Sequence, residues 1–364
     1  MVNLEAYPSH GGQLRQIAER FGIPICDLLD FSANINPSGP PSCVLSTLRA
    51  SLDSLATLTE YPDLRQTDLR QSLARYVGTN EQNVAVANGF VPLLEAALHA
   101  LKIRRCLLPV PAFVEYRKTL ERAGVEVVPH KLSADSLFRY DPTAMLTGQC
   151  DAVLLANPQN PSGVCLDFDS ICDLVARASA KSMFVLLDEA FIDYLPEYSL
   201  TPRIDRFPKL IVFRSVTKFY GIPGLRVAYA ISNSKHSIAI GDGVAPWPIT
   251  TLASYAVIAA LDDREYAERS RSENRIRSVA LQRDLDSSGL TLYPSAASFV
   301  LFGLPPAIDP DVFWEHMILK YRIVLRSCGN YEGLAKGHFR AAIRTQNENR
   351  KLAAAVLKAL SDLQ

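Results

Sequence analysis

The segment SVTKFYGIPGLR (215–226) begins one residue after the apolar run IVF (211–213) and contains a lysine, two hydroxyls and an arginine. A lysine at the mouth of a mostly apolar site has a lowered pKa, so its amine becomes a nucleophile that can form a Schiff base. Ser215 and Thr217 offer hydroxyl donors and Arg226 a guanidinium fork, which are groups that hold a phosphate. Most lysines that follow a strand are surface charges, so a Schiff-base role for Lys218 needs support from residues elsewhere in the sequence.

Two more polar side chains stand where apolar runs end. Asp188 follows four apolar residues in FVLLDEAF, and a half-buried carboxylate requires a cationic partner, such as an arginine, a metal ion or a protonated ring nitrogen. A metal is the weakest option, because the six histidines are scattered and no carboxylate cluster has ligand spacing. Asn160, in the turn NPQNPSG, can present its amide to a ligand, although such a turn can also be purely structural.

A third set of candidates follows two other apolar runs. Gly89 precedes a helix that begins FVPLLEAAL, and a glycine there lets the backbone N–H groups of Phe90 and Val91 approach an anion. A plain strand-to-helix turn would look the same. Phe113 could lie flat against an aromatic ligand, but taken alone it is better interpreted as part of the core.

The elements that must position these residues form an alternating pattern over residues 80–235. The apolar runs carry four to six apolar residues without strict alternation, which is typical of strands buried on both faces of a mostly parallel sheet. Ligands of such sheets bind beyond the carboxyl ends of the strands, where the polar residues above collect. The predicted strands are 83–89, 105–111, 151–158, 183–191, 209–216 and 226–232, and the predicted helices between them are 90–102, 112–123 and 168–181.

After residue 265 strands and helices no longer alternate regularly, which predicts a smaller α+β domain. We divide the chain into an N-terminal segment (1–44), expected to pack with the small domain and the active site, a large domain (45–264) and a small domain (265–364). The fold class is therefore α/β, with a mostly parallel sheet in the large domain.

Composition excludes several classes of function. The chain has 364 residues with a formal net charge of zero, so it lacks the basic footprint of a nucleic-acid-binding protein. Seven cysteines without a CxxC pair indicate reduced thiols rather than a disulfide framework. We see no signal peptide and no apolar run near the roughly 20 residues that span a bilayer, so we expect a cytoplasmic protein.

Taken together, Asn160, Asp188, Ser215-x-Thr217-Lys218 and Arg226 resemble the motifs of pyridoxal-phosphate enzymes with the aspartate aminotransferase fold (fold type I). The resemblance implies that Lys218 carries pyridoxal 5'-phosphate as a Schiff base and that Asp188 pairs with its protonated ring nitrogen. It also implies that Asn160 binds the ring hydroxyl and that Phe113 stacks on the ring. The cofactor phosphate would be held by Gly89, Phe90, Val91, Ser215, Thr217 and Arg226.

The resemblance further implies a homodimer with its active site at the subunit interface. Tyr61, in EYPD, resembles the tyrosine that such dimers lend to the cofactor phosphate of the neighbouring subunit. Arg344, in FRAAIRT, is expected to bind the substrate carboxylate. His10, Asn34 and Arg326 are candidates for a substrate phosphate, although His10 could equally be a plain loop residue.

Within this fold the chain is similar, nearly end to end, to the branch that contains histidinol-phosphate aminotransferase and L-threonine-O-3-phosphate decarboxylase. Phe191 matches the decarboxylase pattern, since the aminotransferase usually has tyrosine there. Phe90 and Val91 replace the hydroxyl or acidic residue usual after the glycine, and Ser298 replaces an asparagine. Segments that favour the decarboxylase are 10–12, 28–41, 187–197, 214–226 and 324–334.

The expected reaction is decarboxylation of L-threonine-O-3-phosphate in cobalamin biosynthesis. Three alternatives stay open: transamination of histidinol phosphate or a similar amine, decarboxylation of phosphoserine to ethanolamine phosphate, and a non-catalytic relative. The phosphoamino acids differ by one methyl, which is worth only about 1–3 kcal/mol in an apolar pocket.

Overall fold

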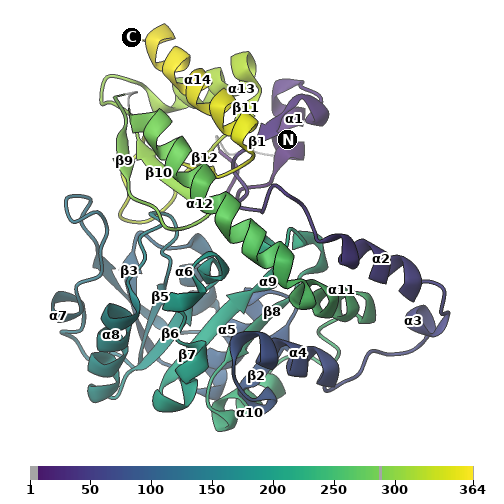
Figure 1. Cartoon of the computed structure of the whole chain (residues 1–364). Helices are drawn as coiled ribbons and strands as arrows, with labels where there is room; N and C mark the ends of the chain where they lie inside the picture. The colour runs from purple at the N-terminus through teal and green to yellow at the C-terminus, as the bar shows by residue number, and fades with distance from the viewer. Residues whose placement is uncertain (1–6, 287–288, 364) are drawn as a thin grey trace.

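The computed structural model describes residues 7–286 and 289–363, which form a large lower lobe and a smaller upper lobe (Figure 1). Residues 1–6 of the expected N-terminal segment lie outside the described residues. The helices are α1 (Leu14–Phe21), α2 (Ser42–Ser51), α3 (Ala56–Thr59), α4 (Thr67–Val77), α5 (Phe90–Ala100), α6 (Val114–Arg122), α7 (Pro142–Met145), α8 (Phe168–Ala180), α9 (Val216–Phe219), α10 (Ser234–Asp242), α11 (Thr251–Asp262), α12 (Arg264–Asp286), α13 (Pro310–Tyr321) and α14 (Gln346–Asp362). The strands are β1 (Leu29–Asp30), β2 (Val84–Ala87), β3 (Arg105–Val110), β4 (Glu126–Lys131), β5 (Ala152–Ala156), β6 (Phe184–Asp188), β7 (Leu210–Ser215), β8 (Ala228–Ile231), β9 (Thr291–Tyr293), β10 (Phe299–Gly303), β11 (Ile323–Val324), β12 (Arg326–Ser327) and β13 (His338–Ala342).

The large lobe is built on a sheet with the strand order β2-β8-β7-β6-β5-β3-β4. Neighbours from β7 to β4 run parallel, while β8 is antiparallel to both β7 and β2. This confirms the predicted mostly parallel sheet. The predicted strands and helices are all present within a few residues of their expected bounds. Strand β4 and several helices of the large lobe, among them α2, α4, α10 and α11, were not predicted.

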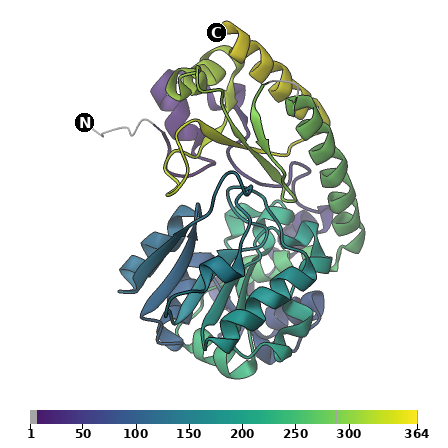
Figure 2. The ribbon, with the colours of Figure 1, turned by 90° about the vertical axis from the view of Figure 1, so that its left-hand side faces the viewer.

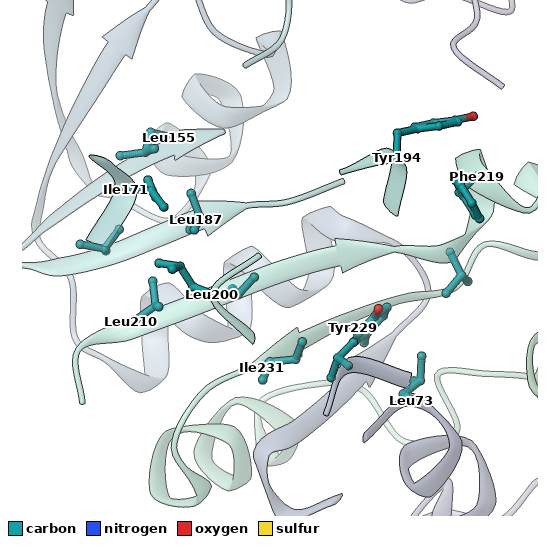
Figure 3. Close-up of a cluster of buried hydrophobic side chains, with 14 of the residues drawn as sticks. Leu73, Leu155, Ile171, Leu187, Tyr194, Leu200, Leu210, Phe219, Tyr229 and Ile231 are labelled. Carbon is teal, nitrogen blue, oxygen red and sulfur yellow. The ribbon is translucent and has the colours of Figure 1, made fainter. Parts of the chain in front are cut away.

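Both faces of this sheet are covered by helices, as the continuous apolar strands require. Along β6, Val185 and Leu187 pack into one core with α4, α8 and α11, whereas Leu186 packs into a second core with α5, α6 and α10. Figure 3 shows part of the first core, where Leu155, Leu187, Leu210 and Ile231 of neighbouring strands meet Ile171 and Leu73 of the covering helices. Because helices cover both faces of the sheet, the ends of the strands are the part of the sheet where a ligand can bind.

The small lobe contains the antiparallel sheet β12-β13-β10-β9, covered by α13 and α14. The N-terminal segment belongs to this core, because Ile17 and Phe31 are buried in it and β1 pairs with β11. Helix α12 runs along one side of the molecule from the large lobe to the small one (Figure 2). Its start contributes Tyr266 to the large core and its end contributes Leu285 to the small core.

No helix within the described ranges is long and apolar enough to cross a membrane.

Candidate active site

A cavity of about 380 Å³ lies where the carboxyl ends of the large-lobe strands meet the small lobe and the N-terminal segment. Most of the residues predicted for cofactor and substrate line it together. They are His10, Asn34, Gly89, Phe90, Val91, Phe113, Asn160, Asp188, Ser215, Thr217, Lys218, Arg226 and Arg326.

Lys218 and Asp188 face this cavity from neighbouring strands. Asp188 ends β6, and Lys218 lies in α9, the short helix that follows β7. Burial lowers the pKa of Lys218, while the charge of Asp188 opposes that shift. The Lys218 Nζ atom lies 4.4 Å from the centre of the Phe191 ring, so an apolar ring forms part of its buried surroundings. The lysine therefore has the environment that makes its amine nucleophilic at moderate pH.

The Asp188 carboxylate is fixed by two donors. Its Oδ2 accepts from the Tyr116 hydroxyl at 2.6 Å and its Oδ1 from the Ala190 amide at 2.8 Å. Burial raises the pKa of Asp188, and the Lys218 charge and these hydrogen bonds oppose the rise. A cationic ring nitrogen placed against this carboxylate would supply the charge partner that its burial calls for.

The predicted phosphate site is a cradle that only glycine permits. Gly89 has φ +103°, and a Cβ atom added there would lie 2.7 Å from the Arg226 Nη2 atom. The next residues, Phe90 and Val91, begin α5, so their N–H groups have no partner inside the helix. Ser215 and Thr217 approach each other at 2.8 Å between their hydroxyl oxygens. This donor set fits the phosphate of the cofactor.

Asn160 is held between the lobes. Its Oδ1 accepts hydrogen bonds from Arg340 Nη1 and, at 3.3 Å, from the Tyr331 hydroxyl. Arg340 is buried on β13 and lies over the Phe299 ring, 5.0 Å from its centre. With its amide oxygen turned toward the guanidinium, Asn34 accepts from Arg340 at 3.3 Å. Arg340 thus presents a buried cation to the cavity.

The N-terminal segment closes one side of the cavity. Arg326 donates from Nη1 to the Pro8 carbonyl at 3.1 Å and from Nη2 to the Ser9 carbonyl at 2.8 Å. His10 Nε2 lies 3.1 Å from Glu115 Oε1. Burial lowers the pKa of His10, with Glu115 opposing the shift. Arg326 therefore anchors the segment that carries His10.

The structure does not bring Arg344 into the cavity. Its guanidinium donates to the Asp30 carbonyl at 3.0 Å and to Glu348 Oε1 at 2.8 Å. Arg344 lies beyond the end of β13, where the chain turns into α14, whereas Arg340 lies within the strand and lines the cavity. The expectation for Arg344 is corrected: the arginine of this segment that reaches the site is Arg340.

Tyr61 also lies away from its own chain's cavity. It is 80% exposed and stacks on Trp247 with ring centres 4.6 Å apart. An exposed position leaves Tyr61 free to contact a neighbouring subunit. Its role at the cofactor phosphate of that subunit stays a prediction.

The cavity residues that were not predicted include Arg340, Tyr331 and Glu115, which bring polar side chains to the site. The alternation of side chains along a strand could have indicated Arg340. Its neighbours Phe339 and Ala341 are apolar and buried on one face of β13, so Arg340 lies on the other face. Tyr331 and Glu115 come from a loop and a helix start, where no periodicity marks the side chains that reach a cavity.

Comparison with known proteins agrees with this geometry. The family model for aminotransferase class I and II matches residues 26–356. Threonine-phosphate decarboxylase of Salmonella typhimurium is 33% identical over 98% of this chain and 97% of its own length. Histidinol-phosphate aminotransferase 2 of Ralstonia nicotianae is 29% identical over 96% of this chain and 94% of its own.

Among solved structures, the histidinol-phosphate aminotransferase of Clostridium acetobutylicum superposes with a TM-score of 0.85 at 28% identity, covering 92% of this chain and 100% of that one. These matches confirm the predicted fold and the predicted cofactor. The chain belongs to the aminotransferase class I and II family, with the fold type I architecture and pyridoxal 5'-phosphate as its cofactor.

Proposed function

We propose that this chain decarboxylates L-threonine-O-3-phosphate to (R)-1-amino-2-propanol O-2-phosphate and carbon dioxide, a step of cobalamin biosynthesis. The observation that carries the proposal is the charge of the cavity beyond the cofactor groups. Arg340, Arg326 and His10 add cationic or donor groups in two places, next to Asn160 and next to the N-terminal segment. A substrate with both a carboxylate and a phosphate needs two such places.

The residues that would hold the cofactor are those of the cradle at Gly89, together with Lys218, Asp188, Asn160 and Phe113. When bound, the cofactor supplies an electron sink for the pair left on Cα once a bond at that carbon breaks. Asp188 serves this chemistry by holding positive charge at the ring nitrogen against the apolar surroundings.

The chain's own residues decide which bond breaks, because the bond perpendicular to the ring plane is the one that cleaves. Arg340 is proposed to bind the substrate carboxylate, with Asn34 orienting the guanidinium. Lys218 Nζ is proposed to deliver the proton to Cα after carbon dioxide leaves. Positioning of this kind can account for several kcal/mol of a barrier.

We assign the substrate phosphate to His10 and the Nε atom of Arg326. The terminal nitrogens of Arg326 already donate to three backbone carbonyls and to Asn330 Oδ1, so its Nε is the donor that remains among the described contacts. Arg326 would thus contribute charge and one hydrogen bond, while it also holds His10 in place.

Transamination of histidinol phosphate is the second candidate, since an aminotransferase of that name is 29% identical to this chain. The cofactor groups would be the same for both reactions. One assay separates them. Carbon dioxide release from phosphothreonine without a keto acid supports the decarboxylase, whereas glutamate formation from histidinol phosphate and 2-oxoglutarate would overturn it. Phosphoserine in the same assay tests the preference for the methyl group.

We also propose that the active enzyme is a cytoplasmic homodimer. Several large apolar side chains in and around α3 are exposed: Leu52 (54%) and Leu55 (73%) before it, Leu58 (64%) within it and Tyr61 (80%) after it. Such a patch supports an interface with a second copy, to whose cofactor phosphate Tyr61 would be lent. The seven cysteines are all free, in keeping with a reducing compartment.

A further inference from the structure

The Tyr331 side chain joins three groups of the cavity. Its hydroxyl lies 3.3 Å from Asn160 Oδ1 and 3.4 Å from Arg340 Nη1, and its ring lies beneath the Arg326 guanidinium at 5.3 Å. Only 3% of Tyr331 is exposed. The loop that carries it also docks on the large lobe, because Arg117 pairs with Glu332 at 2.6 Å and Gly333 packs against Val110.

These contacts fix the orientation of the Asn160 amide. An arginine can only donate, so the atom of Asn160 that Arg340 contacts must be the carbonyl oxygen. The Tyr331 hydroxyl can accept a hydrogen bond from Arg340 and donate one to the same Asn160 oxygen. The hydrogen bonds of the Asn160 side chain found within residues 7–286 and 289–363 are both at Oδ1, and Asn160 lines the cavity. The donor that Asn160 offers to a ligand is therefore its N–H group.

We propose that Tyr331 is a positioning residue that holds the Asn160 amide with its N–H group toward the ring oxygen of the cofactor and couples it to Arg340. A hydrogen bond at Oδ1 polarises the amide and strengthens its N–H as a donor. Phe191 has no hydroxyl, so this N–H carries the interaction without help from that position. The same hydroxyl keeps Arg340 tied to Asn160 until a substrate anion competes for the guanidinium.

This inference rests on the proposed roles of Asn160 and Arg340, but its main test needs no substrate. The visible absorbance of the Lys218 Schiff base is titrated with pH in the full-length holoenzyme and in Tyr331→Phe. A donor to the ring oxygen favours its anionic form and lowers the apparent pKa of the conjugated imine. Tyr331→Phe should therefore raise the midpoint by about half a unit.

The matched control is Tyr293→Phe, which removes a hydroxyl that contacts His338 Nε2 at 3.0 Å in the small lobe outside the cavity. Its midpoint should stay at the wild-type value, while its melting temperature reports the general cost of losing a buried hydroxyl. A double-mutant cycle adds the decisive comparison. In an Asn160→Ala background, Tyr331→Phe should cause no further shift, because the amide that transmits its effect is gone.

An unchanged midpoint in Tyr331→Phe, or the same shift with and without Asn160, would overturn the inference. Tyr331→His keeps an N–H donor and can be tested if the phenylalanine variant does not fold. Its titration midpoint should lie near that of the wild type. A midpoint raised as far as that of Asn160→Ala would contradict the positioning role of Tyr331. With substrate, Tyr331→Phe should raise KM for phosphothreonine more than it lowers kcat. Failure of that substrate to react at all would count against the proposed function and leave the titration result standing.

Discussion

We propose that Lys218 is the nucleophile, because it lies just after a buried strand and beside the apolar ring of Phe191. Lys218→Ala should abolish the visible absorbance of the holoenzyme and reduce turnover by roughly 10²–10⁴-fold or more, since it removes both the attachment and the proton donor. Absorbance spectra and single-turnover rates measure this. Lys181→Ala, at an exposed lysine, is the control and should behave as wild type. Full turnover by Lys218→Ala would contradict the assignment.

Gly89 combines a left-handed backbone conformation with close approach to Arg226. Gly89→Ala should destabilise the fold by about 1–3 kcal/mol and weaken cofactor binding, because the new methyl would displace the guanidinium. Gly124 also has a positive φ, +69°, but open space around it, so Gly124→Ala should lower stability without changing cofactor affinity. Thermal unfolding of the apoprotein and cofactor titration separate the two effects. If Gly89→Ala bound the cofactor as tightly as Gly124→Ala does, the proposed phosphate site at Gly89 would be contradicted.

At the scale of elements, the N-terminal segment depends on Arg326. A lysine can offer a single point charge but cannot bridge the carbonyls of Pro8 and Ser9. Arg326→Lys should therefore loosen residues 8–12, seen as faster limited proteolysis, and raise KM for the phosphorylated substrate. Arg105→Lys, at an exposed ion pair with Glu126, is the matched control. Unchanged proteolysis and KM would argue against the anchoring role.

The elements of the large lobe could be predicted because parallel strands are buried on both faces and their polar residues collect at one end. Strand β4 was not predicted because it lies at the edge of the sheet, where its residues are only partly buried. Such a strand needs no continuous apolar run, and Pro129 and His130 interrupt this one. Arg344 was preferred to Arg340 because a resemblance in sequence does not state which residues of β13 face the cavity. Contacts between the lobes, such as that of Tyr331 with Asn160, depend on how the two lobes pack together, and no local sequence pattern predicts that packing.

At the scale of the whole molecule, the exposed apolar residues around α3 should be covered by a second copy. Leu58→Asp should convert a dimer to a monomer, because it places a charge in the apolar patch. Sedimentation velocity measures the mass, and cofactor retention should fall as Tyr61 of the neighbour is lost. Leu319→Asp, at an exposed leucine of α13 in the small lobe, should leave the mass unchanged. A wild-type chain that is monomeric when active would contradict this arrangement.

We propose that this molecule breaks the bond between Cα and the carboxylate of a phosphoamino acid. The fate of the carboxyl carbon tests it most directly. Purified holoenzyme is incubated in D₂O with phosphothreonine labelled at its carboxyl carbon, and no keto acid is added. We expect one labelled carbon dioxide for each aminopropanol phosphate formed, with one deuterium at the former Cα. Label retained in a keto acid, with no carbon dioxide released, would contradict it.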